Sequence, residues 1–258
     1  HMSWTLQELF ARKSVRVYEN RPIAQTEKEA ILRASLEAPT AGNMTMFTIL
    51  DITDQSLKEQ LVTTCDNQPF IAKAPLVLVF LADYQRWYDA YCYEQAEGEP
   101  PRLPDAGDLM LAACDALIAA QNAVVAAESL GIGSCYIGDI LENFEQHQKL
   151  FRLPKYAIPV AMLCFGYPTK QQEARIKPAR FDSKYIVHEN TYSQADRDTL
   201  CAAFTDRAQR AGKPDYSYPQ EIRAMMKRKY QSDFSREMSR SVHAMLKSWC
   251  SGKKKKGN

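Results

Sequence analysis

The feature that most constrains the fold is one alanine-rich stretch that runs from Asp105 to Gly131. Ala, Leu, Met, Gln and Glu dominate it, and all five residue types favour the α-helix. Asp105 and Asp108 stand at its start, where the helix dipole favours negative charge, and Gly131 stands where a left-handed C-terminal cap is usual. Apolar residues occupy more than one face, which is typical of a helix buried on most sides. The stretch therefore predicts a long central helix with close neighbours.

A short strand is predicted directly after this helix, in the segment from Gly131 to Ile140. It ends in Gly138-Asp139, and a glycine at such a place lets the backbone approach a ligand closely. The alternative interpretation is a core helix that simply leads into a core strand.

Three further apolar runs predict strands, and helical patterns separate them. The predicted strands are Met46–Thr53, Pro75–Ala82 and Ile158–Phe165, and the last two are continuous enough to be buried on both faces. A capping pattern at Ser56–Glu59 predicts the start of one of the helices. Strands that alternate with helices indicate an α/β or an α+β fold.

Size and charge limit the class of protein. The chain has 258 residues, of which 45% are hydrophobic, and this is enough for a sizeable core. Residues 1–192 carry 18 Lys and Arg against 24 Asp and Glu, whereas residues 193–258 carry 15 against 7. The basic part ends in the lysine run 253–256, which we expect to be a solvated tail, because no nucleic-acid-binding motif accompanies it.

Cysteine and histidine usage gives expectations about compartment and metals. The seven cysteines are dispersed without a C-x-x-C spacing, and there are only four histidines. We therefore expect reduced thiols, a cytoplasmic protein and no metal site. The chain has no run of eighteen apolar residues, so we expect no transmembrane helix.

A basic segment near the start is the first candidate for ligand binding. Arg12-Lys-Ser-Val-Arg16 places two guanidinium groups, an ammonium and a hydroxyl within five residues. Guanidinium binds phosphate through paired hydrogen bonds, so the segment suits a phosphate, although a solvated basic turn has the same composition. No convincing Ser/His/Asp or Cys/His nucleophile set is apparent, and His147 and His188 are expected to be structural. Any redox work would then fall to a cofactor.

Several motifs occur together and in a fixed order. They are Arg12-x-Ser14-x-Arg16, Pro39-Thr-Ala-Gly-Asn43, Gln68, Gly131–Gly138, Lys177-Pro-Ala-Arg180 and Val187-His-Glu-Asn190. The ordered set resembles the nitroreductase family of FMN enzymes, and most of all its NADPH nitroreductase and flavin reductase branch. The resemblance covers roughly residues 5 to 192.

The resemblance implies a fold and an assembly. The fold would be α+β, with a central mixed β-sheet flanked by helices and a long buried central helix. Two copies would form a homodimer, with FMN bound at the subunit interface. Residues 3–192 would make the FMN-binding domain. Residues 193–258 would form a helical, basic C-terminal extension that packs on the same domain or on the partner subunit.

The resemblance also implies which residues bind the cofactor. The set is Arg12, Lys13, Ser14, Arg16, Thr40, Asn43, Gln68, Tyr136, Ile137, Gly138, Asp139, Lys177 and Arg180. Arg16 would lie at the N1/O2 edge of the flavin, a backbone N–H of the 136–139 segment would lie near N5, and Lys177 and Arg180 would complete the phosphate site. Asp139 stands where this branch often has Gly, and it adds a carboxylate near the ring that would lower the flavin potential.

The expected activity is that of an FMN-dependent NAD(P)H oxidoreductase. It would reduce nitroaromatics, quinones or flavins by a ping-pong, two-electron hydride mechanism. NADPH is expected as the favoured co-substrate, with Arg207 and Arg210 as its binding residues. The expected partners are a second copy and a small-molecule electron acceptor, with no nucleic acid and no membrane. The alternatives are a specialised flavin enzyme, such as a dehalogenase or a flavin-destroying enzyme, and a non-enzymatic flavin-binding, redox-responsive protein.

Overall fold

The computed structural model describes residues 1–252, and they form two compact units. The first unit comprises residues 1–175 together with the described residues from Glu237 onward, and the second comprises Ile176–Arg236. The predicted boundary at residues 192 and 193 is therefore displaced. The chain leaves the first unit after Arg175 and returns to it within the C-terminal helix.

The first unit is built on a four-stranded sheet. Its strands are β1 (Phe47–Asp51), β2 (Leu76–Asp83), β3 (Gly133–Tyr136) and β4 (Ala157–Gly166), in the spatial order β1-β2-β4-β3. All three ladders between these strands are antiparallel. The parallel component of the predicted mixed sheet is a single bridge between Ser14 and Ser134.

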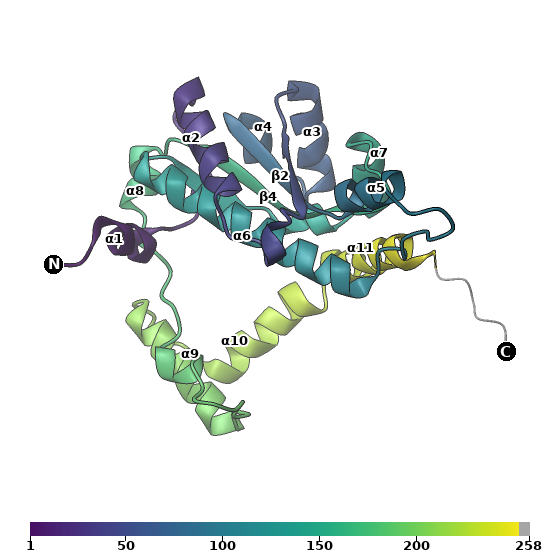
Figure 1. The fold of residues 1–258 in the computed structure, drawn as a ribbon. Helices are drawn as coiled ribbons and strands as arrows, with labels where there is room; N and C mark the ends of the chain where they lie inside the picture. The colour runs from purple at the N-terminus through teal and green to yellow at the C-terminus, as the bar shows by residue number, and fades with distance from the viewer. Residues whose placement is uncertain (253–258) are drawn as a thin grey trace. The chain divides into compact units, whose positions relative to one another are not determined.

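Helices cover both faces of this sheet. They are α1 (Trp4–Ala11), α2 (Gln25–Leu36), α3 (Gln55–Thr64), α4 (Phe70–Lys73), α5 (Gln85–Tyr93), α6 (Ala106–Ser129), α7 (Phe144–Leu150), α8 (Lys170–Ala174) and α11 (Asp233–Cys250). Leu78 and Phe80 of β2 face α2 and α6, whereas Val77 and Val79 face α3 and α4 (Figure 1). Every residue of β2 is buried, which confirms the prediction of a strand buried on both faces.

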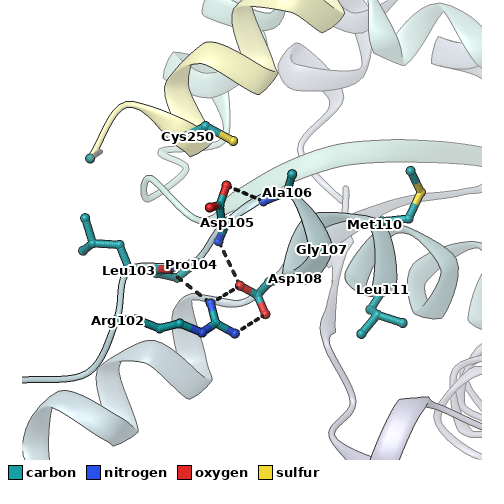
Figure 2. A pocket seen from close by; sticks show the side chains of 11 residues that line it. Arg102, Leu103, Pro104, Asp105, Ala106, Gly107, Asp108, Met110, Leu111 and Cys250 are labelled. Atoms are coloured by element: carbon teal, nitrogen blue, oxygen red, sulfur yellow. Dashed lines mark hydrogen bonds and ion pairs between the residues drawn. The ribbon is translucent and has the colours of Figure 1, made fainter. Parts of the chain in front are cut away.

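The central helix α6 begins and ends where the sequence predicts. Asp105 is its N-cap, and the Asp108 carboxylate accepts a hydrogen bond from the Asp105 backbone N–H at 2.8 Å (Figure 2). Arg102 donates two hydrogen bonds to Asp108, at 2.6 and 3.0 Å, and holds the pKa of that carboxyl below its ordinary value. Gly131 closes the helix with φ at +75°, the left-handed geometry that favours glycine.

One face of α6 is buried and the opposite face is not. Small residues on the inner face, such as Ala112, Ala116 and Ala120, have no exposed surface and pack against α2 and the sheet. The outer face carries apolar side chains that remain exposed in the single chain, at 68% for Met110 and 47% for Leu117. The helix is thus less completely buried than its composition predicts. It is long and apolar enough to cross a membrane, but its inner face makes it a core helix of this fold.

A buried carboxylate on α6 holds the loop that precedes β1. Asp115 is 2% exposed, and it accepts hydrogen bonds from the backbone N–H groups of Ala41 at 3.1 Å and Met46 at 3.2 Å. Gly42 and Asn43 between them have positive φ, at +57° and +55°. The loop therefore depends on one side chain for its attachment to the core.

The C-terminal helix α11 is part of the same core from Glu237 onward. Trp249 is fully buried, donates from its indole N–H to the Asp105 carbonyl at 3.1 Å, and meets the Tyr156 ring edge-on. Arg240 binds Glu145 through two hydrogen bonds, at 2.9 and 3.0 Å. This part of the predicted C-terminal extension thus packs within the first unit, and the predicted lysine tail 253–256 lies outside the described residues.

The second unit is helical. It contains short 3-10 and π turns at Ser183–Tyr185 and Met226–Tyr230 and the helices α9 (Arg197–Arg210) and α10 (Tyr218–Met225). Phe204 of α9 packs edge-on against Phe181 and tilted against Tyr218.

Removal of the Asp115 carboxylate should destabilise the first unit. Asp115→Ala leaves two loop N–H groups without their acceptor, and we expect the free energy of unfolding to fall by about 2–4 kcal/mol. Asp115→Asn keeps one acceptor oxygen and should fall between this variant and wild type. Chemical denaturation measures both, with exposed Glu29→Ala as a control that changes stability by less than about 0.5 kcal/mol. An Asp115→Ala protein as stable as the control would contradict this role.

Candidate functional site

The basic segment from Arg12 to Tyr18 lies along the edge strand β3. The Val15 N–H donates to the Ser134 carbonyl at 3.0 Å, and Arg12 reaches the same carbonyl at 3.3 Å. Further on, Tyr18 forms an antiparallel bridge with Pro168. The segment is therefore an ordered flank of the sheet and not a solvated turn.

Two glycines make this close approach possible. A Cβ atom at Gly133 would lie 2.6 Å from Val15 Cγ2 and 2.8 Å from Val15 Cβ. A Cβ atom at Gly166 would lie 2.5 Å from the Tyr18 ring. Since real Cβ contacts are longer than this, only glycine at both positions lets the basic segment dock against the sheet.

Four cations gather in this region without a carboxylate partner. Arg12, Lys13 and Arg16 come from the basic segment, and Arg175 follows α8. Lys13 donates to the carbonyls of Glu173 and Arg175, while Arg175 donates to the Ser14 carbonyl at 2.6 Å. None of the four forms an ion pair with any residue between 1 and 252. Their partners are neutral, so their positive charge is available to an anion.

The individual atoms of these cations show where an anion could bind. The Nε atoms of Arg12 and Arg175 are buried and have no hydrogen-bond partner. Arg16 is exposed, and its guanidinium makes no hydrogen bond with the described part of the chain, although its backbone N–H donates to Gln172 Oε1 at 3.0 Å. The sequence prediction missed Arg175, although it opens the basic run that continues to Arg180.

The opposite end of β3 carries acidic and amide groups. The chain leaves β3 at Ile137, whose N–H donates to the Met162 carbonyl at 2.8 Å, and enters a short 3-10 turn at Gly138–Leu141. Gly138 is exposed, and a Cβ atom there would meet nothing within 4 Å. Asp139 is half-buried, and its Oδ2 accepts a hydrogen bond from Gln68 Nε2 at 2.9 Å. The structure therefore brings together Gln68 and the 136–139 segment, as expected for one site.

A carboxyl group that the sequence prediction missed lies beside Asp139. Glu142 is 5% exposed, its Oε2 atom has no hydrogen-bond partner, and its carboxyl is hydrogen-bonded to that of Asp139. Burial and the neighbouring acids raise the pKa of Glu142 to about 8. No sequence motif marks Glu142, because only the turn at Gly138–Leu141 brings it against Asp139.

The predicted residues Thr40 and Asn43 lie in the loop that Asp115 holds. Thr40 Oγ1 accepts the Thr45 N–H at 3.1 Å, and Asn43 is exposed. Six residues further along α6, Gln121 accepts a hydrogen bond from the Tyr136 hydroxyl at 3.1 Å. At 1.5 Å per residue the two attachment points are about 9 Å apart along the helix. The helix α6 thus supports both the loop and the end of β3.

Four predicted residues lie in the second unit. The Arg180 side chain donates to the Pro178 carbonyl at 3.0 Å, and Lys177 is half-buried. The Arg207 guanidinium lies over the Phe181 ring at 4.0 Å, and Arg210 binds Asp206 at 2.9 Å. These residues are described within their own unit, and their assignment to FMN and NADPH stays a prediction.

The other features of the structure lie away from the predicted cofactor residues. An open hollow of about 950 Å³ surrounds the start of α6 and the end of α11, and Arg102, Asp105 and Asp108 in its wall are occupied in capping the helix (Figure 2). Residues 1–252 contain no cluster of three or more His, Cys, Asp or Glu that could hold a metal ion. His147 is buried and shares a 2.8 Å hydrogen bond with Thr64.

Comparison with known proteins gives a consistent result. The sequence profile of the Nitroreductase family matches residues 9–167. The chain is 34% identical over 199 residues to an oxygen-insensitive NADPH nitroreductase of Salmonella typhimurium, and the match covers 77% of this chain and 79% of that protein.

Solved structures give the same answer for the fold. Nitroreductase A from Vibrio parahaemolyticus superposes with a TM-score of 0.81 at 27% identity, over 98% of this chain and all of that one. The NADPH:FMN oxidoreductase from Vibrio harveyi, complexed with NAD+, superposes with a TM-score of 0.77 at 25% identity, over 94% and 97% of the two chains. The fold and the sequence together define a nitroreductase-type protein. The chain belongs to the Nitroreductase family, as the ordered motifs predicted.

The docking of the basic segment should depend on Gly133. Gly133→Ala forces the segment away from β3, because the Val15 Cβ atom in its path is fixed to the backbone. We expect the free energy of unfolding to fall by about 1–3 kcal/mol. Gly107→Ala is the matched control, since Gly107 lies in α6 with nothing within 4 Å, and it should raise stability by about 0.5–1 kcal/mol. Chemical denaturation of the two variants measures the difference, and equal changes of the same sign would contradict the docking argument.

Proposed function

We propose that this protein is an FMN-dependent NAD(P)H oxidoreductase that reduces nitroaromatics, quinones or flavins. The observation that carries the proposal is the polarity of the site along β3. Four cations without carboxylate partners lie beside the start of the strand, and the exposed Gly138 follows its end. The four residues from Ser134 to Gly138 span about 13 Å at 3.3 Å per residue. A ligand with an anionic phosphate at one end and an uncharged ring at the other fits this arrangement.

The residues present suit FMN in particular. Arg12, Lys13 and Arg175 supply positive charge for its phosphate, and the unpartnered Nε atoms of the two arginines are donors for it. Gly138 leaves room for a flat ring against the backbone. We assign Lys177 or Arg180 of the second unit to the phosphate as well, on the family motif. When bound, FMN supplies the two-electron hydride chemistry, and the protein supplies binding and electrostatics.

Arg16 and Gln68 have separate tasks in this proposal. The exposed guanidinium of Arg16 would face the N1/O2 edge of the ring, where positive charge stabilises the anionic reduced form. The Gln68 side chain would orient the ring through a hydrogen bond. Thr40 and Asn43 would contribute from the loop held by Asp115, in the same subunit or in its partner.

The names of the relatives support the choice of co-substrate. The Salmonella relative is an NADPH nitroreductase, and the Vibrio harveyi structure is an NADPH:FMN oxidoreductase. We propose NADPH as the favoured reductant, with Arg207 and Arg210 as candidates for its 2′-phosphate. Both arginines have partners within the second unit, so they would have to exchange these for the nucleotide.

We further propose that two copies form a homodimer through the outer face of α6. Four apolar side chains point outward on this helix and are 42–68% exposed, and α1 beside it exposes Trp4 and Phe10. The outward-facing residues are Met110, Leu111, Leu117 and Ile118. Exposed apolar surface of this extent on a helix favours burial against a partner. All seven cysteines are free of disulfides, which is compatible with the proposed cytoplasmic location.

The central test is optical and kinetic. We expect the purified protein to be yellow with FMN, to bleach when NADPH is added without oxygen, and to regain colour with a quinone or a nitroaromatic. Nicotinamide and acceptor would use the same open face of the ring, so the first product must leave before the second substrate binds. Initial rates over both substrates should therefore give parallel double-reciprocal lines.

Each contrary outcome identifies an alternative. Intersecting lines would reject the shared face but keep the oxidoreductase. A yellow protein that never oxidises NADPH with any acceptor would indicate a flavin-binding, redox-responsive protein. Net loss of the flavin itself during turnover would indicate a flavin-destroying enzyme. A colourless protein that takes up no FMN would reject the proposal as a whole.

The dimer has its own test. Leu117→Asp places a charge in the middle of the exposed apolar stripe, and we expect it to shift the protein from a dimer toward the 29.3 kDa single chain. Tyr93→Asp is the matched control, because Tyr93 is 83% exposed at the end of α5, outside this stripe. Light scattering distinguishes the two states. A wild-type monomer that still holds FMN would refute the dimer.

A further inference from the structure

The carboxyl pair of Asp139 and Glu142 has no role in the function proposed above. The two groups lie in hydrogen-bonding contact, and two carboxylates can make such a contact only when a proton lies between them. Glu142 is the more deeply buried member, at 5% exposure, and its Oε2 atom has no partner of any kind. The proton therefore belongs on Glu142, with Asp139 as the acceptor.

Every ionisable neighbour of Glu142 reinforces this assignment. Asp66 from the loop before α4, Asp139 from the 3-10 turn and Glu237 from α11 all act on it with negative charge. Burial lowers the pKa of His147 on α7 to about 4 and raises the pKa of Cys65 to about 12, so neither is charged near neutral pH. Arg240, which lies nearby on α11, is bound to Glu145 and Glu237.

The hydrogen bonds of Gln68 carry the effect toward the ligand site. Its Nε2 group donates to the Cys65 carbonyl at 2.8 Å and to Asp139 Oδ2 at 2.9 Å. Both partners are acceptors, so the amide nitrogen must face them and the amide cannot flip. The Gln68 Oε1 atom accepts no hydrogen bond from the described residues, and it is the only polar atom of this side chain left for a ligand.

We propose that Glu142 and Asp139 are positioning residues for the flavin site: Glu142 donates to Asp139, and Asp139 fixes the Gln68 amide with its oxygen toward an N–H edge of the ring. This inference rests on the proposed FMN function. The chain Glu142–Asp139–Gln68 also leaves one negative charge on the carboxyl pair instead of two, so Asp139 is compatible with a bound flavin as long as Glu142 keeps its proton.

The pair should make FMN binding depend on pH. The pKa of Glu142 is raised to about 8 in the folded protein, so the proton is present at pH 7 and is largely lost at pH 9. Loss of the proton removes the donor to Asp139 and adds a second negative charge beside the ring. We expect the FMN dissociation constant to rise about tenfold between pH 7 and pH 9, the loss of one charge-assisted hydrogen bond. The FMN phosphate, with a pKa of about 6, is already ionised throughout this range.

The experiment titrates FMN into flavin-free protein at pH 7 and pH 9. Glu142→Gln keeps a neutral donor to Asp139, and it should bind FMN like wild type at pH 7 and show no further weakening at pH 9. Asp139→Ala should bind about tenfold more weakly at both pH values, because Gln68 loses its acceptor. Glu145→Gln is the matched control, since Glu145 is exposed and paired with Arg240, and it should keep the wild-type pH profile. Identical pH profiles for wild type and Glu142→Gln would overturn the proposal.

Two measurements on the flavin-free protein do not depend on FMN. The infrared spectrum at pH 7 should contain the C=O stretch of one protonated carboxylic acid, which Glu142→Gln removes. The folded pKa lies above the unfolded value, so the stabilisation by this proton is complete below about pH 4.5 and is lost as pH rises through about 8. Glu142→Gln should therefore melt above wild type at pH 9 but not at pH 5. Absence of the infrared band would overturn the proposal, whereas normal spectra with no FMN uptake at any pH would overturn the proposed function instead.

Discussion

The close contact between the alanine face of α6 and its neighbours is the constraint on which the rest of the structure depends. Ala112, Ala116 and Ala120 have no exposed surface, so the helix axis can approach α2 and the sheet closely. Polar groups then fasten other segments to the same helix. Ser35 of α2 donates to the Ala119 carbonyl at 2.8 Å, and Asp115 holds the loop before β1. A larger residue on this face would displace the helix and every segment attached to it.

A separation of charge along β3 gives the site its chemical character. The positive end is held by close backbone packing at Gly133 and by hydrogen bonds from Arg12 and Arg175 to carbonyl oxygens. Because these bonds use neutral acceptors, they position the cations without cancelling their charge. At the other end Glu142 is buried among acids, and one shared proton keeps that end from repelling an electron-rich ring. Together the two ends favour a ligand that is anionic at one end only.

Several site residues were predictable, and others were not, for a physical reason. Arg12 and Arg16 stand out because guanidinium groups two turns of side chain apart on an extended segment are a local pattern. Asp139 was recognised only as an extra carboxylate near the flavin. Its partners Glu142 and Gln68 determine whether that charge matters, and Gln68 is 71 residues away in the chain. A pKa depends on burial and on neighbours in space, so no local pattern reports it.

The sequence by itself determined the long helix with its caps at Asp105 and Gly131, the buried strands and the family, because periodicity, propensity and ordered motifs are local properties. It placed the start of α3 at Ser56, whereas Asp54 caps the helix by accepting the Leu57 N–H at 3.1 Å. Only the tertiary structure decided which face of α6 stays exposed, where the chain divides into two units, and which side chains meet beyond the end of β3. These depend on contacts between residues far apart in the chain, whose strength is set by burial and not by spacing along the sequence.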